Sequence, residues 1–383
     1  MAAIQPVRSS RGLRSSLSSL AQPAERKPLS TDWILVSIVG ALVIFGLIMS
    51  YSTTFYWSVS QEGNPFSLFF KQLIYAGVGL VLFLVLSYLD YGIWHKLALP
   101  LMVLAIGLLL AVLFFGTRTF GATRTLFNGS LQPSEPAKII ILLYGAAWLA
   151  SRRKQVTSIT VGLVPFIIII GTVVGLIIAE PDLSTSIIIL IAASAMFFLA
   201  GASLIQIVMV GGLAAGLAYL MVGVFQHVSN RISGFKNGFE EVYQIKQALI
   251  SIGSGGLFGT GIGGSYQKFG LLPAQHTDSV IAVVTEEMGL IGMVIVLILL
   301  AALAYRCLVI VQRSDTPFGA FWAIGLTTWL MMQALLNMMA NTGLIPLPGV
   351  PIPFISYGGS SLISVLAAAG ILVSISRGTK RLK

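Results

Sequence analysis

Residues 271–278 read Leu271-Leu-Pro-Ala-Gln-His-Thr-Asp278, and they run directly into an apolar segment that carries Glu286 and Glu287. Only 9% of the chain is charged and 56% is hydrophobic, so three carboxylates and an imidazole in so short a stretch are unusual. Charge next to lipid costs free energy and marks a functional site more often than not. The stretch therefore combines the signal for a membrane-spanning helix with the strongest candidate for chemistry.

The apolar pattern around this stretch recurs along most of the 383 residues, and the mean hydropathy is +0.92. Runs of about 20 apolar residues have the length that crosses a bilayer as a helix. A β-barrel would alternate apolar and polar residues instead. The sequence predicts an all-α polytopic membrane protein with about ten transmembrane helices. The expected spans are residues 33–56, 68–89, 96–115, 137–151, 158–178, 183–200, 203–225, 279–308, 317–342 and 355–376.

The distribution of Lys and Arg predicts the orientation of these spans. With the N-terminus in the cytoplasm, fifteen of the 23 basic residues fall on the cytoplasmic side, as the positive-inside rule requires. The net charge of +10 thus reflects topology rather than nucleic-acid binding. We expect a disordered, basic cytoplasmic arm at 1–32, a single transmembrane domain at 33–376 and a basic cytoplasmic tail at 377–383. Two cytoplasmic termini require an even number of spans, with eight as the alternative to ten.

The largest connection, residues 226–278, is expected on the outer side. Within it, residues 239–251 place apolar side chains on one helical face, which predicts a helix lying in the membrane interface. A glycine-rich run at 253–264 follows. It has neither the strand–helix context of a dinucleotide site nor the Gly-Lys-Ser/Thr of a P-loop. We interpret it as a loop that permits close backbone approach, with phosphate binding through N–H groups as an alternative.

Asp278 and His276 end this loop at the mouth of the next helix. A carboxylate there also suits helix capping, so capping competes with a functional role for Asp278. On an ideal helix Glu286 lies roughly 80° around the axis from Asp278, and Glu287 lies roughly opposite it. At most one of the two glutamates is then expected on the side of Asp278. Pairing with Arg or backbone groups in a packed interior is an equal alternative for both.

A second candidate site lies at the end of the outer loop 116–136. Glu135 and Lys138 are three residues apart and would be neighbours on a helix, which predicts a local ion pair. Alternatively, Lys138 binds an anionic headgroup together with Arg124 from the same loop.

Other signals in the sequence are weaker. Glu180 and Asp182 flank Pro181 between two spans, and we interpret them as a polar turn, with the lining of a cavity as an alternative. No Cys/His cluster marks a zinc site, and no serine-hydrolase nucleophile motif is present.

Eight strings resemble, in order, those of one family. They are Gly121-Ala-Thr-Arg124, Gln132-Pro-Ser-Glu-Pro-Ala-Lys138, Pro181-Asp-Leu-Ser-Thr185, Gln244-Ile-Lys-Gln-Ala-Leu-Ile250, Gly253-Ser-Gly-Gly-Leu-Phe-Gly259, Leu272-Pro-Ala-Gln-His-Thr-Asp278, Glu286-Glu-Met-Gly289 and Pro353-Phe-Ile-Ser-Tyr-Gly-Gly-Ser-Ser361. Together they resemble the SEDS family (shape, elongation, division and sporulation), which includes FtsW, RodA and SpoVE. The last string is most similar to the division-type FtsW.

The resemblance implies a ten-span peptidoglycan glycosyltransferase in the bacterial cytoplasmic membrane. Such an enzyme polymerises lipid II, an undecaprenyl-diphosphate-linked substrate, at the outer face for cell division or cell shape. A class B penicillin-binding protein is the expected partner, together with other divisome or elongasome proteins.

The resemblance also implies roles for particular residues. Asp278 is the expected catalytic residue, acting as general base. A divalent cation, Mg²⁺ or Mn²⁺, could assist, with Asp278 as a candidate ligand, and no organic cofactor is expected. The expected substrate-binding residues are Lys138, Arg124, Glu135, His276 and Glu286.

Two other functions stay open from the sequence. One is a transporter that flips a lipid-linked precursor, and the other is a non-catalytic scaffold for a penicillin-binding protein. The candidate residues lie at outer helix ends, which favours an enzyme. A transporter would place coupling groups near the midplane, where Glu286 and Glu287 are the best candidates.

Overall fold

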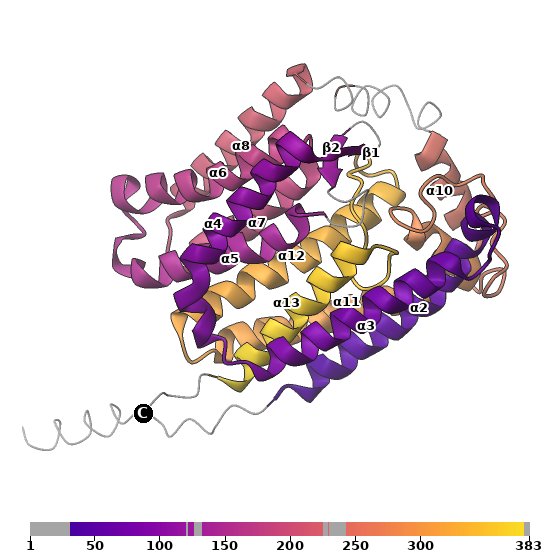
Figure 1. Ribbon diagram of the computed structural model, residues 1–383, viewed down its shortest axis with the longest axis horizontal. Helices are drawn as coiled ribbons and strands as arrows, with labels where there is room; N and C mark the ends of the chain where they lie inside the picture. Colours follow the sequence, from indigo (N-terminus) through magenta and orange to yellow (C-terminus); the bar gives the residue numbers. More distant parts are fainter. Residues whose placement is uncertain (1–30, 120–121, 126–131, 225–228, 230–242, 379–383) are drawn as a thin grey trace, which may run out of the picture.

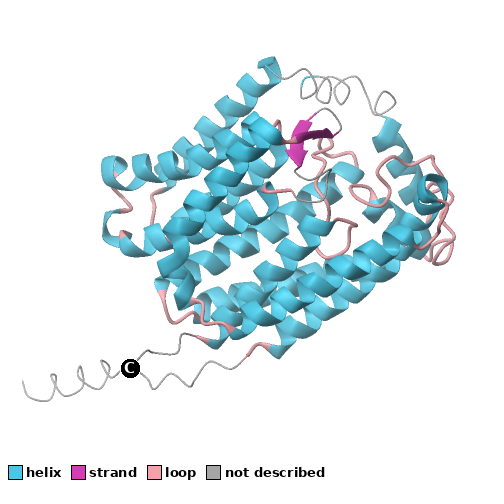
Figure 2. Cartoon of the chain, viewed as in Figure 1, coloured by secondary structure: helices cyan, strands magenta, loops and turns pink. Residues whose placement is uncertain are grey.

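The computed structural model is a bundle of helices with one small hairpin (Figure 1 and Figure 2). It describes residues 31–119, 122–125, 132–224, 229 and 243–378. A helix occupies each of the ten predicted spans. These helices are α2 (Trp33–Glu62), α3 (Ser67–Tyr88), α4 (Gly92–Phe115), α5 (Ser134–Ser151), α6 (Val164–Ala179), α7 (Leu183–Leu199), α8 (Leu204–Val224), α11 (Val280–Arg313), α12 (Pro317–Asn341) and α13 (Gly359–Arg377).

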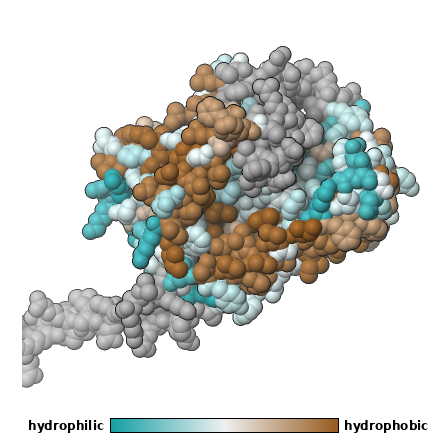
Figure 3. Space-filling model, in the orientation of Figure 1, coloured by the Kyte–Doolittle hydropathy of each residue, from teal (hydrophilic) through white to brown (hydrophobic). Residues whose placement is uncertain are grey.

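Within the described part of the chain, seven helical segments are long and apolar enough to cross a membrane, namely α2, α3, α4, residues 159–179, α11, α12 and α13. A short 3-10 helix η1 (Arg153–Gln155) and a π-helical turn η2 (Ile159–Leu163) precede α6. Large apolar side chains such as Val81, Phe114 and Ile298 are more than half exposed. Figure 3 shows hydrophobic side chains over much of the helical surface in that view. Apolar exposure on this scale requires lipid around it, and the chain is a multi-pass membrane protein.

Helix ends fall where short polar side chains can cap them. The Asp32 carboxylate accepts a hydrogen bond from the backbone N–H of Leu35 at 3.0 Å at the start of α2. The Asp182 carboxylate accepts one from Thr185 N–H at 3.1 Å at the start of α7, directly after α6 ends at Ala179. Each cap satisfies an N–H group that the first helical turn leaves without a partner. The polar turn predicted at residues 180–182, between α6 and α7, is therefore confirmed.

The helix ends that the charge distribution assigns to the same side of the membrane contact one another. Arg306, near the end of α11, binds Asp32 before α2 with an N–O distance of 2.6 Å. Arg377, at the end of α13, donates to the carbonyl oxygen of Ser87 near the end of α3. These segments were all expected on the cytoplasmic side, and they lie at one end of the bundle. The loops that we expect outside contact one another at the opposite end, which we call the outer end after this expectation.

The outer loop after α4 contains a hairpin that the sequence did not predict. Strands β1 (Thr117–Thr119) and β2 (Ala122–Thr125) pair in antiparallel fashion. Arg124 lies on β2, while its side chain is outside the described part of the structure.

The helix predicted in the large outer loop is confirmed as α10 (Tyr243–Ser254). Its buried residues Ile245, Ala248 and Ser251 lie on one face, and α10 packs against α11. This face therefore contacts α11, and the position of α10 in the membrane interface stays a prediction. The expected start of this helix at 239–242, the arm at 1–30 and the tail at 379–383 lie outside the described residues.

Candidate functional site

A tight turn holds Asp278 immediately before α11. The carbonyl oxygen of Ala274 accepts hydrogen bonds from the backbone N–H groups of Thr277, Asp278 and Ser279, each at 3.1 Å. The first helical residue is Val280, and the residue at the N-cap is Ser279. The turn thus fixes the backbone of Asp278 at the mouth of the helix, as the sequence predicts, two residues before the first turn begins.

Three amide side chains on one face of α12 hold the surroundings of Asp278. Asn337 and Asn341 each donate to the carbonyl oxygen of Asp278 at 2.8 Å. Asn337 also donates to the carbonyl of Val350 at 2.7 Å, in the proline-rich loop before α13. Gln333 lies one turn earlier on the same helix. These residues were not predicted from the sequence, although amides spaced four apart in an apolar helix are a readable signal.

Lys138 is buried in a cluster at the start of α5, only 2% exposed. Its ammonium lies 2.9 Å from Glu135 Oε1 and 3.3 Å from Gln333 Oε1, and 4.8 Å from the centre of the Trp329 ring. The predicted ion pair with Glu135 is confirmed. The other carboxylate oxygen of Glu135, Oε2, is buried and accepts no hydrogen bond. We call Glu135, Lys138, Trp329 and Gln333 the Lys138 cluster.

Helix α12 connects the Lys138 cluster to Asp278. The Gln333 side-chain oxygen accepts hydrogen bonds from the Lys138 ammonium and from the Trp329 indole N–H. The Gln333 amide nitrogen donates to the carbonyl oxygen of Pro351 at 2.8 Å. Gln333 and the Asp278-binding Asn337 are one helical turn apart. A buried cation and a carboxylate-bearing turn are thus fixed on the same rigid helix at the outer end of the bundle.

His276 lies in an aromatic environment beside Asp278. The centre of its ring is 5.7 Å from that of Trp57 and 5.6 Å from that of Tyr357. Burial lowers the pKa of His276 from 6.5 to about 4, so its imidazole is neutral at pH 7. Its Nδ1 atom is buried without a hydrogen-bond partner. His276 therefore contributes a neutral ring rather than a positive charge.

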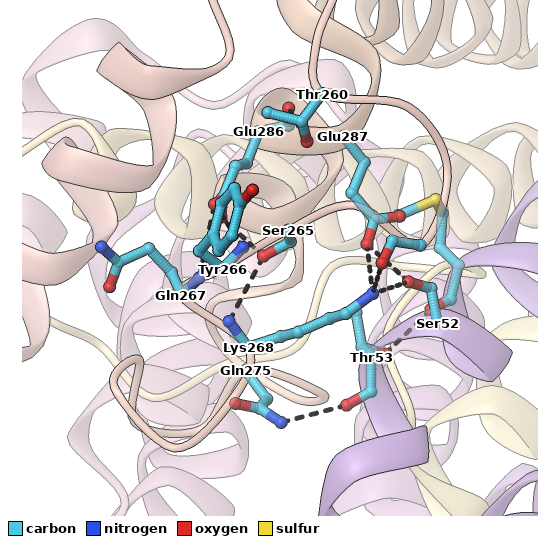
Figure 4. Close-up of polar contacts among 12 residues, drawn as sticks. Ser52, Thr53, Thr260, Ser265, Tyr266, Gln267, Lys268, Gln275, Glu286 and Glu287 are labelled. Atoms are coloured by element: carbon cyan, nitrogen blue, oxygen red, sulfur yellow. Dashed lines mark hydrogen bonds and ion pairs between the residues drawn. The ribbon is translucent and has the colours of Figure 1, made fainter.

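Glu286 is anchored entirely by protein groups (Figure 4). One carboxylate oxygen accepts from the hydroxyls of Ser251 and Ser265 at 2.7 and 2.6 Å. The other accepts from the backbone N–H groups of Tyr266 and Gln267 at 2.7 and 3.3 Å. Four donors fill the capacity of this carboxylate. A contact of Glu286 with substrate stays a prediction, and it would require some of these bonds to break.

Glu287 forms a buried ion pair with Lys268 of the outer loop. The N–O distance is 2.7 Å, and Ser52 of α2 donates to the same carboxylate oxygen at 2.6 Å. Figure 4 shows the Lys268 side chain extended toward Glu287 and Ser52. We call Ser52, Ser265, Lys268, Glu286 and Glu287 the loop-anchoring cluster.

Helix α11 is broken at Gly289, whose φ of 67° and ψ of −164° are not helical. The glycine-rich run fills the break. Thr260 and Gly261 donate backbone hydrogen bonds to the carbonyls of Glu286 and Glu287, both at 2.9 Å. A Cβ on Gly259 would lie 2.2 Å from the Glu287 carbonyl oxygen, so only glycine fits there. The predicted close backbone approach is confirmed.

The late start of α11 at Val280 corrects the helical projection of the glutamates. Asp278 is not part of the helix, so its angle to Glu286 and Glu287 is set by the turn rather than by helical periodicity. Both glutamates instead face the outer loop, since both bind its residues.

The carboxylates suit a metal ion only in a limited way. The described residues contain no group of three or more His, Cys, Asp or Glu side chains that could hold one. Mg²⁺ is often bound by one or two carboxylates together with substrate phosphate oxygens. Asp278 alone therefore fits Mg²⁺ or Mn²⁺ only in combination with a phosphate-bearing substrate.

The sequences of known proteins align with almost the whole length of this chain. The chain is 34% identical to stage V sporulation protein E of Bacillus subtilis, with 92% of this chain and 98% of that protein covered. It is also 34% identical to a probable peptidoglycan glycosyltransferase FtsW of Trichlorobacter lovleyi, with 93% and 96% covered.

Two solved structures share the fold. One comes from work described as structural coordination of polymerization and crosslinking by a peptidoglycan synthase complex, with a TM-score of 0.75, 27% identity, and 91% and 98% of the two chains covered. The other is the rod shape determining protein RodA of Thermus thermophilus, with a TM-score of 0.68, 28% identity, and 91% and 97% of the two chains covered. Residues 32–381 match the cell cycle protein family of FtsW, RodA and SpoVE, and the chain belongs to that family.

Proposed function

We propose that this protein is a peptidoglycan glycosyltransferase that polymerises lipid II into glycan strands. The observation that carries the proposal is the arrangement at the outer end of α12. A carboxylate residue, Asp278, and a buried ammonium, Lys138, are fixed to one helix through the amides of Asn337 and Gln333. Relatives named as probable peptidoglycan glycosyltransferases support the assignment to this reaction.

Asp278 is the proposed general base. It accepts the proton of the 4-hydroxyl of the acceptor sugar as that oxygen attacks the anomeric carbon of the donor. The bond from this carbon to the polyprenyl diphosphate breaks, and the diphosphate leaves with the electron pair. Attack from the back side inverts the anomeric centre, so an α-linked diphosphate becomes a β-linked glycan. General-base catalysis of this kind contributes about 10²–10⁴-fold.

Lys138 is the proposed partner of the leaving diphosphate, and Arg124 is a second candidate from the loop above it. A fixed cation in a site with little water stabilises the negative charge that develops on the leaving group. The Glu135 ion pair holds the ammonium in place before substrate binds. A bound Mg²⁺ or Mn²⁺ would supply further charge at the diphosphate. His276, neutral at pH 7, is proposed to contact a sugar by hydrogen bonding or ring packing.

The proposed location is the bacterial cytoplasmic membrane, with both termini in the cytoplasm and the site on the outer face. The basic residues at the opposite end of the bundle support this orientation. A class B penicillin-binding protein is the proposed partner, since a similar fold occurs in a peptidoglycan synthase complex. Other membrane proteins of the divisome or elongasome are proposed to join them. The relatives named FtsW favour a role in division over one in cell shape.

The contacts of Glu286 and Glu287 weaken the rival transporter hypothesis. Broken helices in transporters present free backbone groups and charges to a substrate cavity near the midplane. Here the carbonyls at the Gly289 break are bound by Thr260 and Gly261. Lys268 neutralises Glu287 at 2.7 Å. These groups are thus occupied by the protein itself, which leaves the outer end of α12 as the better candidate site.

Replacement of Asp278 by Asn tests the proposal, because Asn keeps the shape and loses the basic carboxylate. The variant is reconstituted with its partner, and the polymerisation of labelled lipid II is followed on gels. We expect a loss of about 10²–10⁴-fold. Asp32→Asn, at the opposite end of the bundle, is the matched control and should retain activity. A wild-type yield of polymer from Asp278→Asn would exclude Asp278 as the general base. If the wild-type protein makes no polymer but flips lipid II across vesicle membranes, the transporter hypothesis is favoured.

A further inference from the structure

Lys268 ties the loop that carries Asp278 to two helices at once. Its ammonium donates to Glu287 Oε1 of α11 at 2.7 Å, to Ser52 Oγ of α2 at 2.9 Å and to the carbonyl of Gly263 at 2.8 Å. The side chains of Lys268 and Glu287 are 4% and 0% exposed. All three donors of the ammonium are therefore used inside the protein, at a place where water does not screen the ion pair.

We infer that Lys268 and Glu287 are positioning residues: their buried ion pair holds the loop so that Asp278 lies in its working position against α12. The inference rests on the proposed function for its activity readout. Neither residue is assigned a contact with substrate. They act through the backbone that links Lys268 to the turn at Asp278.

Between Lys268 and Asp278, contacts of neutral groups also hold the loop. Tyr357 N–H donates to the carbonyl of His276 at 2.8 Å, and Ser356 Oγ donates to that of Thr277 at 2.6 Å. Residues 262–279 contain no helix or strand. Between Lys268 and the Asp278 turn, the side chain of Leu272 is buried, and Gln275 donates to the carbonyl of Thr53 at a long 3.3 Å. The Lys268–Glu287 pair adds to these contacts two opposite charges that are buried together, where water does not screen them.

Loss of one charge should displace the loop, because it leaves the other charge buried without a counterion. The loop can relieve this by moving and admitting water. Asp278 would then lose its register with Asn337 and Asn341, which hold its carbonyl. A shift of about 1 Å at a reacting group can cost about 100-fold in rate. Removing the charges of both Lys268 and Glu287 leaves no unpaired buried charge. Asp278 should then return close to its wild-type position.

The experiment compares Lys268→Met, Glu287→Gln and the double variant in lipid nanodiscs with lipid II. We expect Lys268→Met to lower kcat by about 10–100-fold, with the KM for lipid II changed by about twofold or less. The double variant should recover at least about tenfold of that loss. Lys71→Met is the matched control. Its ammonium lies at the same 2.7 Å from a glutamate, Glu62, but the pair is exposed, and kcat should stay within about twofold.

Hydrogen exchange of the backbone provides a readout that does not depend on activity. Residues 262–279 should exchange faster in Lys268→Met than in the wild type, and the double variant should return toward wild-type exchange. Two results overturn the inference. One is a folded Lys268→Met protein with wild-type kcat, and the other is unchanged exchange in this stretch. If wild-type protein makes no polymer, the proposed function fails, while hydrogen exchange still decides whether the ion pair holds the loop.

Discussion

Two buried lysine–glutamate pairs lie at the outer end of the bundle, and their surroundings differ. Lys268 has three oxygen acceptors, and they come from α2, α11 and its own loop. Lys138 has two, Glu135 and Gln333, and its remaining side faces the Trp329 ring at 4.8 Å. The first pair joins a loop to the bundle. The second lies between two helices, α5 and α12, whose apolar residues pack together without it.

The difference separates structural charge from charge that is available to a ligand. An ammonium with a full set of oxygen acceptors has nothing left to offer a substrate. An ammonium over an aromatic ring can exchange a weaker contact for a diphosphate oxygen. Activity should therefore survive when both charges of the Lys268–Glu287 pair are removed. It should be lost when both charges of the Lys138–Glu135 pair are removed. Four experiments at this end of the bundle sharpen the comparison, and the one on Lys138 tests it directly.

The largest effect is expected at Lys138. Lys138→Met should lower kcat by about 10²–10³-fold, the typical cost of losing one group that stabilises developing charge. The variant Lys138→Met/Glu135→Gln restores neutrality and should stay inactive, which would contrast with the Lys268→Met/Glu287→Gln pair. Labelled lipid II polymerisation is the measurement, and Lys246→Met, on the exposed face of α10, is the control. Recovery of activity in the double variant would remove the distinction between the two clusters.

The next largest effect is expected where the glycine-rich run meets α11. A Cβ on Gly255 would lie 2.0 Å from the carbonyl oxygen of Thr285, whereas one on Gly253 meets nothing within 4 Å. Gly255→Ala should therefore lower the free energy of unfolding by about 1–3 kcal/mol, measured by chemical unfolding in mixed micelles. Gly253→Ala is the matched control. Equal stability of the two variants would mean that the run does not need its close approach.

A smaller effect is expected for Glu286→Gln. The amide oxygen can still accept from the N–H groups of Tyr266 and Gln267, and the amide nitrogen can donate to the hydroxyls of Ser251 and Ser265 after these rotate. We expect a loss of about 1 kcal/mol in stability and polymerisation within about threefold of wild type. A loss of about 100-fold or more at unchanged stability would support the prediction that Glu286 binds substrate.

The smallest effect is expected at His276, outside both clusters. Burial lowers its pKa from 6.5 to about 4, so the folded protein favours the neutral imidazole. The stability contributed by this preference is fully present above pH 6.5 and is lost progressively as the pH falls from 6.5 to about 4. Wild-type protein should lose more unfolding free energy than His276→Gln between pH 7 and pH 5. Polymerisation should show no step near pH 6.5 that depends on His276, and such a step would contradict the neutral ring.

Local features of the sequence predicted most of the fold. Length and hydropathy give the spans, Asp182 marks its turn, and the spacing of Glu135 and Lys138 gives their ion pair. Each of these depends on residues close in the chain. The close approach of the glycine-rich run was also predictable, because only glycine permits it, although its partner, α11, was not.

The remaining features depend on contacts between distant residues. Ser52 and Glu287 are 235 positions apart, and nothing local shows that they meet. Either Arg or backbone groups were expected to pair with the glutamates. The structure gives backbone N–H groups and serine hydroxyls to Glu286, and a lysine to Glu287. The break at Gly289 was missed because the apolar pattern continues across it, and its cause is the inserted loop.

The break at Gly289 has a consequence for biosynthesis. After the break, residues 290–313 form a helix of roughly 36 Å at 1.5 Å per residue, which alone exceeds a hydrocarbon core of about 30 Å. The insertion machinery can therefore treat that part as an ordinary span. Residues 255–268 bind the backbone carbonyls and the carboxylates of residues 280–288, the segment just before the break. They leave the ribosome before that segment does. The partners of Glu286 and Glu287 are thus already synthesised when these carboxylates emerge, so the two charges can be paired before they face lipid.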